Sequence, residues 1–72
     1  MVTLTFKLSE IGTVSLDIDE PVPFSRVLQL CAQKTGVEIG GVLAVRNGRL
    51  ISGKDLVHSG DQVDVFPALS GG

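Results

Sequence analysis

Residues 2–18, VTLTFKLSEIGTVSLDI, decide the fold of this chain. In both halves of the stretch every second residue is apolar: Val2, Leu4, Phe6 and Leu8, then Val14, Leu16 and Ile18. An apolar period of two is typical of a strand with one buried face. The connection at residues 9–12 is short and contains Gly12, so we predict that the two strands form an antiparallel hairpin.

A helix is predicted to follow the hairpin. Pro21 and Pro23 interrupt the extended pattern, and apolar residues then recur with the spacing of one helical face: Phe24, Val27, Leu28 and Cys31. Gly36 is suited to the C′ position, where a left-handed backbone is common. We therefore predict a helix over residues 23–35 whose apolar face, Leu28 included, is buried.

The second half of the chain predicts shorter elements. Residues 42–45 form a continuous apolar run that indicates a strand inside the sheet. Asn47-Gly48 provides the two positive-φ positions of a type I′ turn, so residues 49–51 should return as a short partner strand. The turn-rich residues 53–61 are expected to contain a single helical turn near residues 55–57.

Residues 62–66 predict the last strand, which Pro67 closes. The element order is strand, strand, helix, strand, short strand, strand. That order indicates an α+β domain over residues 1–67, in which a mixed sheet of four to five strands packs on one helix. Residues 68–72 are expected to be a flexible C-terminal tail ending in Gly-Gly.

Length and composition exclude several function classes. With 72 residues and 43% hydrophobic content, the chain can form one small domain whose thin core leaves little room for an enclosed active site. We therefore expect no enzyme and no catalytic residues. Six basic against eight acidic residues, and three phenylalanines without tryptophan or tyrosine, argue against nucleic-acid binding.

Cysteine and histidine usage limits the chemistry further. Cys31 is the single cysteine and His58 the single histidine, so neither an intramolecular disulfide nor a metal site of the usual ligands is expected. The alternating N-terminus is neither a signal peptide nor a membrane span. We expect a cytoplasmic monomer with no membrane partner, in which Cys31 is a small core residue and His58 is exposed to solvent.

The predicted order resembles the β-grasp, or ubiquitin-like, fold, and residues 60–72, GDQVDVFPALSGG, resemble the small sulfur carriers of the ThiS and MoaD type. Three segments carry the resemblance over essentially the whole chain. They are Asn47-Gly48 followed by Leu50, the Gly60-Asp61 pair before the last strand, and the terminal Gly71-Gly72 at a fixed distance after Phe66-Pro67.

The resemblance implies a function for the chain end. A ubiquitin-activating-like adenylyltransferase would use MgATP to adenylate Gly72, and a sulfur donor such as a cysteine desulfurase would convert the adenylate to a thiocarboxylate. The chain itself would bind no cofactor. Gly71 and Gly72 lack a Cβ that would obstruct a narrow channel, and five extended residues after Pro67 span about 17 Å.

The resemblance also implies docking residues. The family meets its partners through apolar residues at the positions of Phe66 and Leu50, and Pro67 and Leu69 continue the family pattern. If Val63 and Val65 face the helix, strand alternation sends Phe66 to the opposite face. There it meets either a partner protein or the chain's own tail. Positive charge near the same end could steer an acidic partner: Arg46, Arg49 and Lys54.

Which pathway receives the sulfur stays open. Lys7 departs from the apolar residue usual in the molybdopterin carriers, whereas Phe66-Pro67 is closer to those carriers than to the thiamin ones. The acceptor would be a thiazole synthase, the large subunit of molybdopterin synthase, or a tRNA thiolase. The ending also resembles archaeal modifiers, so the alternative is a ubiquitin-like modifier conjugated to lysines through Gly72.

Overall fold

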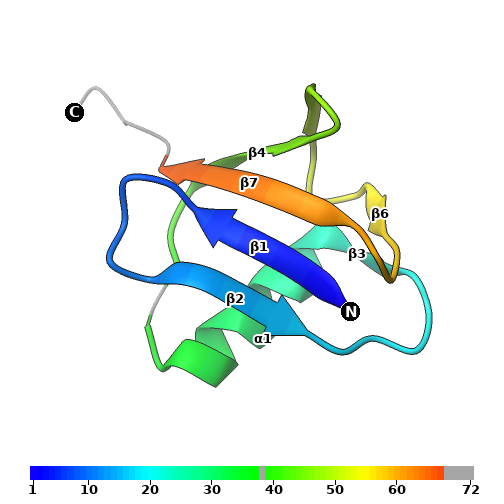
Figure 1. The fold of residues 1–72 in the computed structure, drawn as a ribbon, viewed down its shortest axis with the longest axis horizontal. Helices are drawn as coiled ribbons and strands as arrows, with labels where there is room; N and C mark the ends of the chain where they lie inside the picture. Colours follow the sequence, from blue (N-terminus) through cyan, green and yellow to red (C-terminus); the bar gives the residue numbers. More distant parts are fainter. Residues whose placement is uncertain (38, 68–72) are drawn as a thin grey trace.

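A five-stranded mixed sheet packs on one helix in the computed structural model, which describes residues 1–37 and 39–67 (Figure 1). The strand order is β2-β1-β7-β4-β5. Its strands are β1 (Val2–Phe6), β2 (Gly12–Leu16), β4 (Val42–Arg46), β5 (Arg49–Ile51) and β7 (Gln62–Pro67). Strands β1 and β7 are parallel and the other neighbours antiparallel. The predicted α+β β-grasp fold is therefore confirmed.

The first hairpin pairs β1 with β2 and brings Leu4 opposite Val14. The prediction that the first strand continues to Leu8 is wrong, because β1 ends at Phe6. Leu8 has φ 56° and is 91% exposed, so it belongs to the turn despite continuing the apolar alternation. Gly12, at φ 73°, provides the second left-handed position that this reversal uses.

The helix α1 (Phe24–Thr35) begins one residue later than predicted, after Pro23. Gly36 ends it as predicted, with φ 73° and its N–H donated to the carbonyl oxygen of Ala32 over 2.9 Å. No side chain caps the first turn. Within residues 1–37 and 39–67, no helix is long and apolar enough to cross a bilayer.

A distant segment caps α1 instead. The N–H of Phe24 donates to the carbonyl oxygen of Asp55 over 2.8 Å, and the N–H of Ser25 donates to that of Gly53 over 3.0 Å. These bonds satisfy two of the free amides that every helix start leaves. The second half of the chain therefore determines where the helix begins.

The expected helical turn near residues 55–57 is wrong. Residues Leu56–Val57 form strand β6, which pairs antiparallel with β3 (Val22–Pro23) in a separate two-stranded sheet beside the helix start (Figure 1). Val57 is fully buried there. Pairing with β3 and burial of one valine favour the extended backbone over a helical turn.

The remaining elements agree with the sequence pattern. Asn47 and Gly48 have φ 54° and 77°, as a type I′ turn requires, and Arg46 pairs with Arg49 across that turn. In β7, Val63 and Val65 are buried against α1. The condition on which the outward direction of Phe66 depends, burial of Val63 and Val65, is therefore met.

The core lies between the sheet and α1. Its buried members come from both layers: Val2, Leu4, Phe6, Val14, Leu16, Phe24, Val27, Cys31, Ala44, Val57, Val63 and Val65. Leu28, predicted in that core, is only partly buried and packs at its margin. Position 28 is one residue past Val27, about 100° around the helix, so it faces the boundary between core and solvent.

Cys31 is a core residue, as predicted. The thiol is fully buried, and this desolvation raises its pKa from 9.0 to about 11, while the charge of Lys34 acts weakly in the other direction. A thiolate is the reactive form of cysteine. Burial and the raised pKa together make Cys31 an inert thiol in the folded protein.

Two leucine substitutions test the placement of the core. Leu4→Ala should lower the free energy of unfolding by about 2–5 kcal/mol, because Leu4 is fully buried between both neighbouring strands. Leu28→Ala should lower the free energy of unfolding clearly less, because the Leu28 side chain is already partly exposed to water in the folded protein. Urea denaturation of both variants provides the comparison, and an equal loss would contradict the marginal position of Leu28.

Thiol reactivity tests the burial of Cys31. At pH 8 about one thiol in a thousand is ionised when the pKa is about 11. A thiol reagent should therefore leave the folded protein unmodified and react at once in denaturant. Fast reaction under native conditions would show that Cys31 is accessible.

Candidate functional site

The face of the sheet turned away from α1 carries the residues that the sequence singled out for docking. Val63 and Val65 of β7 point into the core, so Asp64 and Phe66 point outward. Phe66 is half-buried although nothing from α1 covers this face. The predicted outward orientation of Phe66 is therefore confirmed.

Leu50 lies on that same outer face. Cross-strand pairing brings Leu43 of β4 opposite Phe66, and Val45 of β4 opposite Leu50 of β5. These four side chains lie on three adjacent strands, and we call them the outer patch: Leu43, Val45, Leu50 and Phe66. Leu50 is 70% exposed and Leu43 is 53% exposed. Neighbouring apolar side chains on an open sheet face are typical of a surface that a partner covers.

Sequence reasoning missed Leu43 and Val45. Residues 42–45 form an unbroken apolar run, which indicated burial on both faces. In the structure only Ala44 of this run is fully buried against the core. The sequence carried one signal for this alternation. Ala44 is a small residue between the larger Leu43 and Val45, and in β4 Ala44 points into the core while its two neighbours point outward.

Arg46 has a structural role in place of the predicted steering role. Its Nη1 donates to the Leu56 carbonyl oxygen over 2.6 Å and lies 3.1 Å from Oδ2 of Asp61, and both charged side chains are about three-quarters buried. Val42, and not Arg46, pairs with Pro67. Arg46 and Arg49 therefore lie beside the Val45–Leu50 pair, at the end of β4 opposite to Pro67, because β4 runs antiparallel to β7.

The Gly60-Asp61 pair fixes where β7 begins. Gly60 has φ 95° and donates its N–H to the Met1 carbonyl oxygen over 2.8 Å. The carbonyl oxygen of Asp61 accepts a hydrogen bond from the N–H of Thr3 over 3.0 Å. The side-chain Oδ2 of Asp61 accepts one from the N–H of His58 over 2.9 Å. These bonds hold the start of β7 against the start of β1. They consequently set the register that brings Phe66 to the outer face.

The His58 side chain itself is exposed, as predicted. Among the described residues, no three His, Cys, Asp or Glu side chains gather as a metal site would require. The acid–base and nucleophilic groups of residues 1–37 and 39–67 therefore form no metal-binding cluster around the outer patch.

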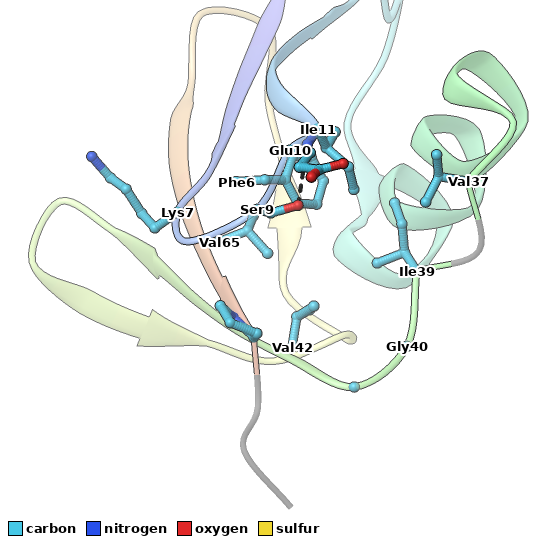
Figure 2. Close-up of a pocket in the computed structure, with 12 residues that line it drawn as sticks. Phe6, Lys7, Ser9, Glu10, Ile11, Val37, Ile39, Gly40, Val42 and Val65 are labelled. Carbon is cyan, nitrogen blue, oxygen red and sulfur yellow. Dashed lines mark hydrogen bonds between the residues drawn. The ribbon is translucent and has the colours of Figure 1, made fainter.

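A pocket opens at the far end of β7, on the side of the sheet that faces α1 (Figure 2). Its volume is about 560 Å³, and it lies between the β1–β2 turn, the chain after α1 and the start of β4. Apolar side chains dominate the lining, including Phe6, Ile11, Ile39, Val42 and Pro67. We call this cavity the end pocket.

Pro67 is exposed, pairs with Val42 and is the last residue that the structure describes. The other predicted site residues, Leu69, Gly71 and Gly72, lie outside the described residues, as does the predicted tail over residues 68–72. The structure thus brings together Leu50 and Phe66 on the outer patch, with Pro67 at the end of the same strand.

Comparison with known proteins agrees with this geometry. A family model described as the ThiS family matches residues 7–72, which includes the Asn47-Gly48 turn, all of β7 and the terminal Gly71-Gly72. Among curated proteins, no sequence matches the chain. The family match covers nearly the whole chain and coincides with a β-grasp domain that carries an outer apolar patch. The chain belongs to the ThiS family.

Proposed function

We propose that this protein is a sulfur carrier whose C-terminal Gly72 is converted to a thiocarboxylate for a biosynthetic sulfur transfer. The observation that carries the proposal is the ThiS family match, which extends to the last residue and so includes Gly71-Gly72. Members of this family are small sulfur carriers, not catalysts. The outer patch adds a surface on which larger partner proteins could bind.

The chemistry begins with activation of the Gly72 carboxylate. A carboxylate is a poor acyl donor, so an adenylyltransferase of the ubiquitin-activating-like family would join one carboxylate oxygen to the α-phosphate of MgATP and release pyrophosphate. The resulting acyl adenylate has AMP as a good leaving group. We assign the ATP site and its catalytic groups to this partner, and Gly72 to the role of substrate.

Sulfur then replaces AMP. The terminal sulfur of a persulfide, supplied by a cysteine desulfurase or a related donor, attacks the acyl carbon and expels AMP. A thiol cleaves the S–S bond of the acyl disulfide, so that one sulfur stays on Gly72 as the thiocarboxylate. Cys31 takes no part in these steps, because its thiol is buried and its raised pKa keeps it protonated.

The outer patch is proposed as the docking surface for both the adenylyltransferase and the sulfur acceptor. Phe66 lies one residue before Pro67, so a partner that covers the patch also lies next to the origin of the tail. Pro67 and Leu69 would then pass along that partner towards its active site. The exposed Leu43 and Leu50 widen the surface across β4 and β5.

The sulfur acceptor is proposed by class: a thiazole synthase, the large subunit of molybdopterin synthase or a tRNA thiolase. The alternative product is an isopeptide between Gly72 and a lysine, as in ubiquitin-like modifiers. Both outcomes begin with the same adenylate, and they differ in whether sulfur or an amine attacks it. The ThiS family match favours sulfur.

Deleting Gly72 should abolish activation and leave the fold unchanged. The tail follows Pro67, beyond the core residues that stabilise the domain. Pyrophosphate exchange with the cognate adenylyltransferase measures activation, and thermal unfolding measures the fold. With the intact chain, MgATP and a sulfur donor, the intact mass should rise by the exchange of one oxygen for sulfur. Undiminished exchange by the truncated chain would refute the role of Gly72.

Aspartate in the outer patch should weaken partner binding without unfolding the domain. Leu50→Asp should change stability by no more than about 0.5 kcal/mol, because Leu50 is mostly exposed. Affinity for the adenylyltransferase should fall at least about tenfold for Leu50→Asp and for Phe66→Asp, as expected for the loss of a central interface anchor.

Thr13→Asp is the matched control, since Thr13 is exposed on the outer face of β2, two strands away from β7. Calorimetric titration with thermal melts of the same variants separates affinity from stability. Affinity equal to that of the unsubstituted chain for both Leu50→Asp and Phe66→Asp would remove the outer patch from the mechanism. A loss with Thr13→Asp as large as with Leu50→Asp would show that charge, and not the patch, governs binding.

A further inference from the structure

The end pocket is an apolar cavity that the docking role of the outer patch leaves unused. It lies on the opposite face of the sheet from that patch, where the layer between sheet and helix is open at one end (Figure 2). Ile11, Ile39 and Val42 pack against the margin of the core and are partly exposed on the pocket side. An apolar side chain that entered the pocket would extend the existing core.

The course of the chain keeps the pocket open. Among the described residues, the last pair between β4 and β7 is Val42–Pro67, and the backbone bends at Gly41. Gly40 and Gly41 line the cavity without side chains, and a Cβ at Gly40 would meet no atom within 4 Å. In Figure 2 the charged side chain of Lys7 points away from the apolar lining. The lining beside Pro67 is thus mainly apolar, with Ser9 and Glu10 among its polar members, and no described side chain fills the cavity.

Strand alternation identifies the occupant. Val63 and Val65 point to the α1 side of the sheet, and both Val65 and Pro67 line the end pocket. An extended continuation of β7 places Leu69 on that same side, two residues and at most about 7 Å beyond Pro67. Leu69 is the one large apolar residue in the sequence after Pro67. The chain therefore carries a leucine at the right parity and distance for the pocket.

We propose that Leu69 docks in the end pocket in the free protein, and that this docked tail withholds Gly72 from the activating enzyme. This regulatory role rests on the proposed function of Gly72. Burial of one leucine and the ordering of a few tail residues are opposing free energies of similar size. Docked and released tails are therefore both populated, and a partner that binds the released tail shifts the balance.

Methyl NMR of the full chain tests the docking directly. We expect nuclear Overhauser contacts between the Leu69 methyl groups and the methyl groups of Ile39 and Val42. Leu69→Ser should shift the Ile39 and Val42 resonances. Ala68→Ser is the matched control, because in an extended continuation of β7 residue 68 points to the other face of the sheet. This substitution should leave the Ile39 and Val42 resonances unchanged. No contacts and no shift with Leu69→Ser would overturn the proposal.

Binding to the adenylyltransferase tests the consequence with Leu69 left intact. Ile39→Ser and Val37→Ser weaken the pocket wall and should lower the apparent Kd for the adenylyltransferase by about two- to tenfold, the factor by which the released fraction rises. Val37 is 44% exposed, so its substitution spares the fold. Ile18→Ser, outside the pocket but at the core margin, controls for lost stability.

An unchanged or higher apparent Kd for both pocket variants would overturn the regulatory role. If the Ile39 resonances shift only when the adenylyltransferase is added, the partner and not Leu69 occupies the end pocket. That result would also overturn the regulatory role. If methyl contacts to Leu69 are present but no variant, nor the intact chain, is adenylated, then docking stands and the sulfur-carrier proposal fails. The two proposals therefore fail separately.

Discussion

Parallel pairing of β1 with β7 is the constraint on which the rest of the structure depends. The two strands are the centre of the sheet, and their inward side chains, Leu4 and Val63 among them, are almost completely removed from water. The other three strands of this sheet are joined by antiparallel pairing, β2 to β1, β4 to β7 and β5 to β4. Because β7 is central, its outward residues are flanked on both sides, which places Phe66 between Leu43 of β4 and the polar outer face of β1, and not at an edge of the sheet.

The sequence pattern predicted elements whose stability is local. The hairpin, the face of α1 and the Asn47-Gly48 turn each depend on residues within a few positions of one another, so alternation and turn chemistry suffice. The start of α1 could not be predicted, because its capping carbonyls belong to Gly53 and Asp55, which are far along the chain. The same holds for Leu56–Val57, which is a strand only because β3 lies beside it.

The same distinction between local pattern and long-range pairing applies to the residues of the candidate site. The outward direction of Phe66 followed from the alternation of β7, and the position of Leu50 followed from a recognisable turn. The contribution of Leu43 required the register between β4 and β7, which links two distant segments. Arg46 shows the opposite error: charge alone suggested a surface role, whereas the antiparallel direction of β4 brings the guanidinium to Asp61. Long-range pairing, unlike local pattern, was not available from the sequence.

The central position of β7 also has a consequence for biosynthesis of the chain. A ribosome releases β1 first, yet the parallel partner of β1 is not synthesised until residues 62–67. The hairpin of β1 and β2 can form early, but one edge of β1 then has no hydrogen-bonding neighbour while residues 17–61 are added. Until β7 emerges, that edge and its apolar face are open to pairing with other chains. Completion of the sheet therefore coincides with the appearance of the strand that directly precedes the C-terminal segment.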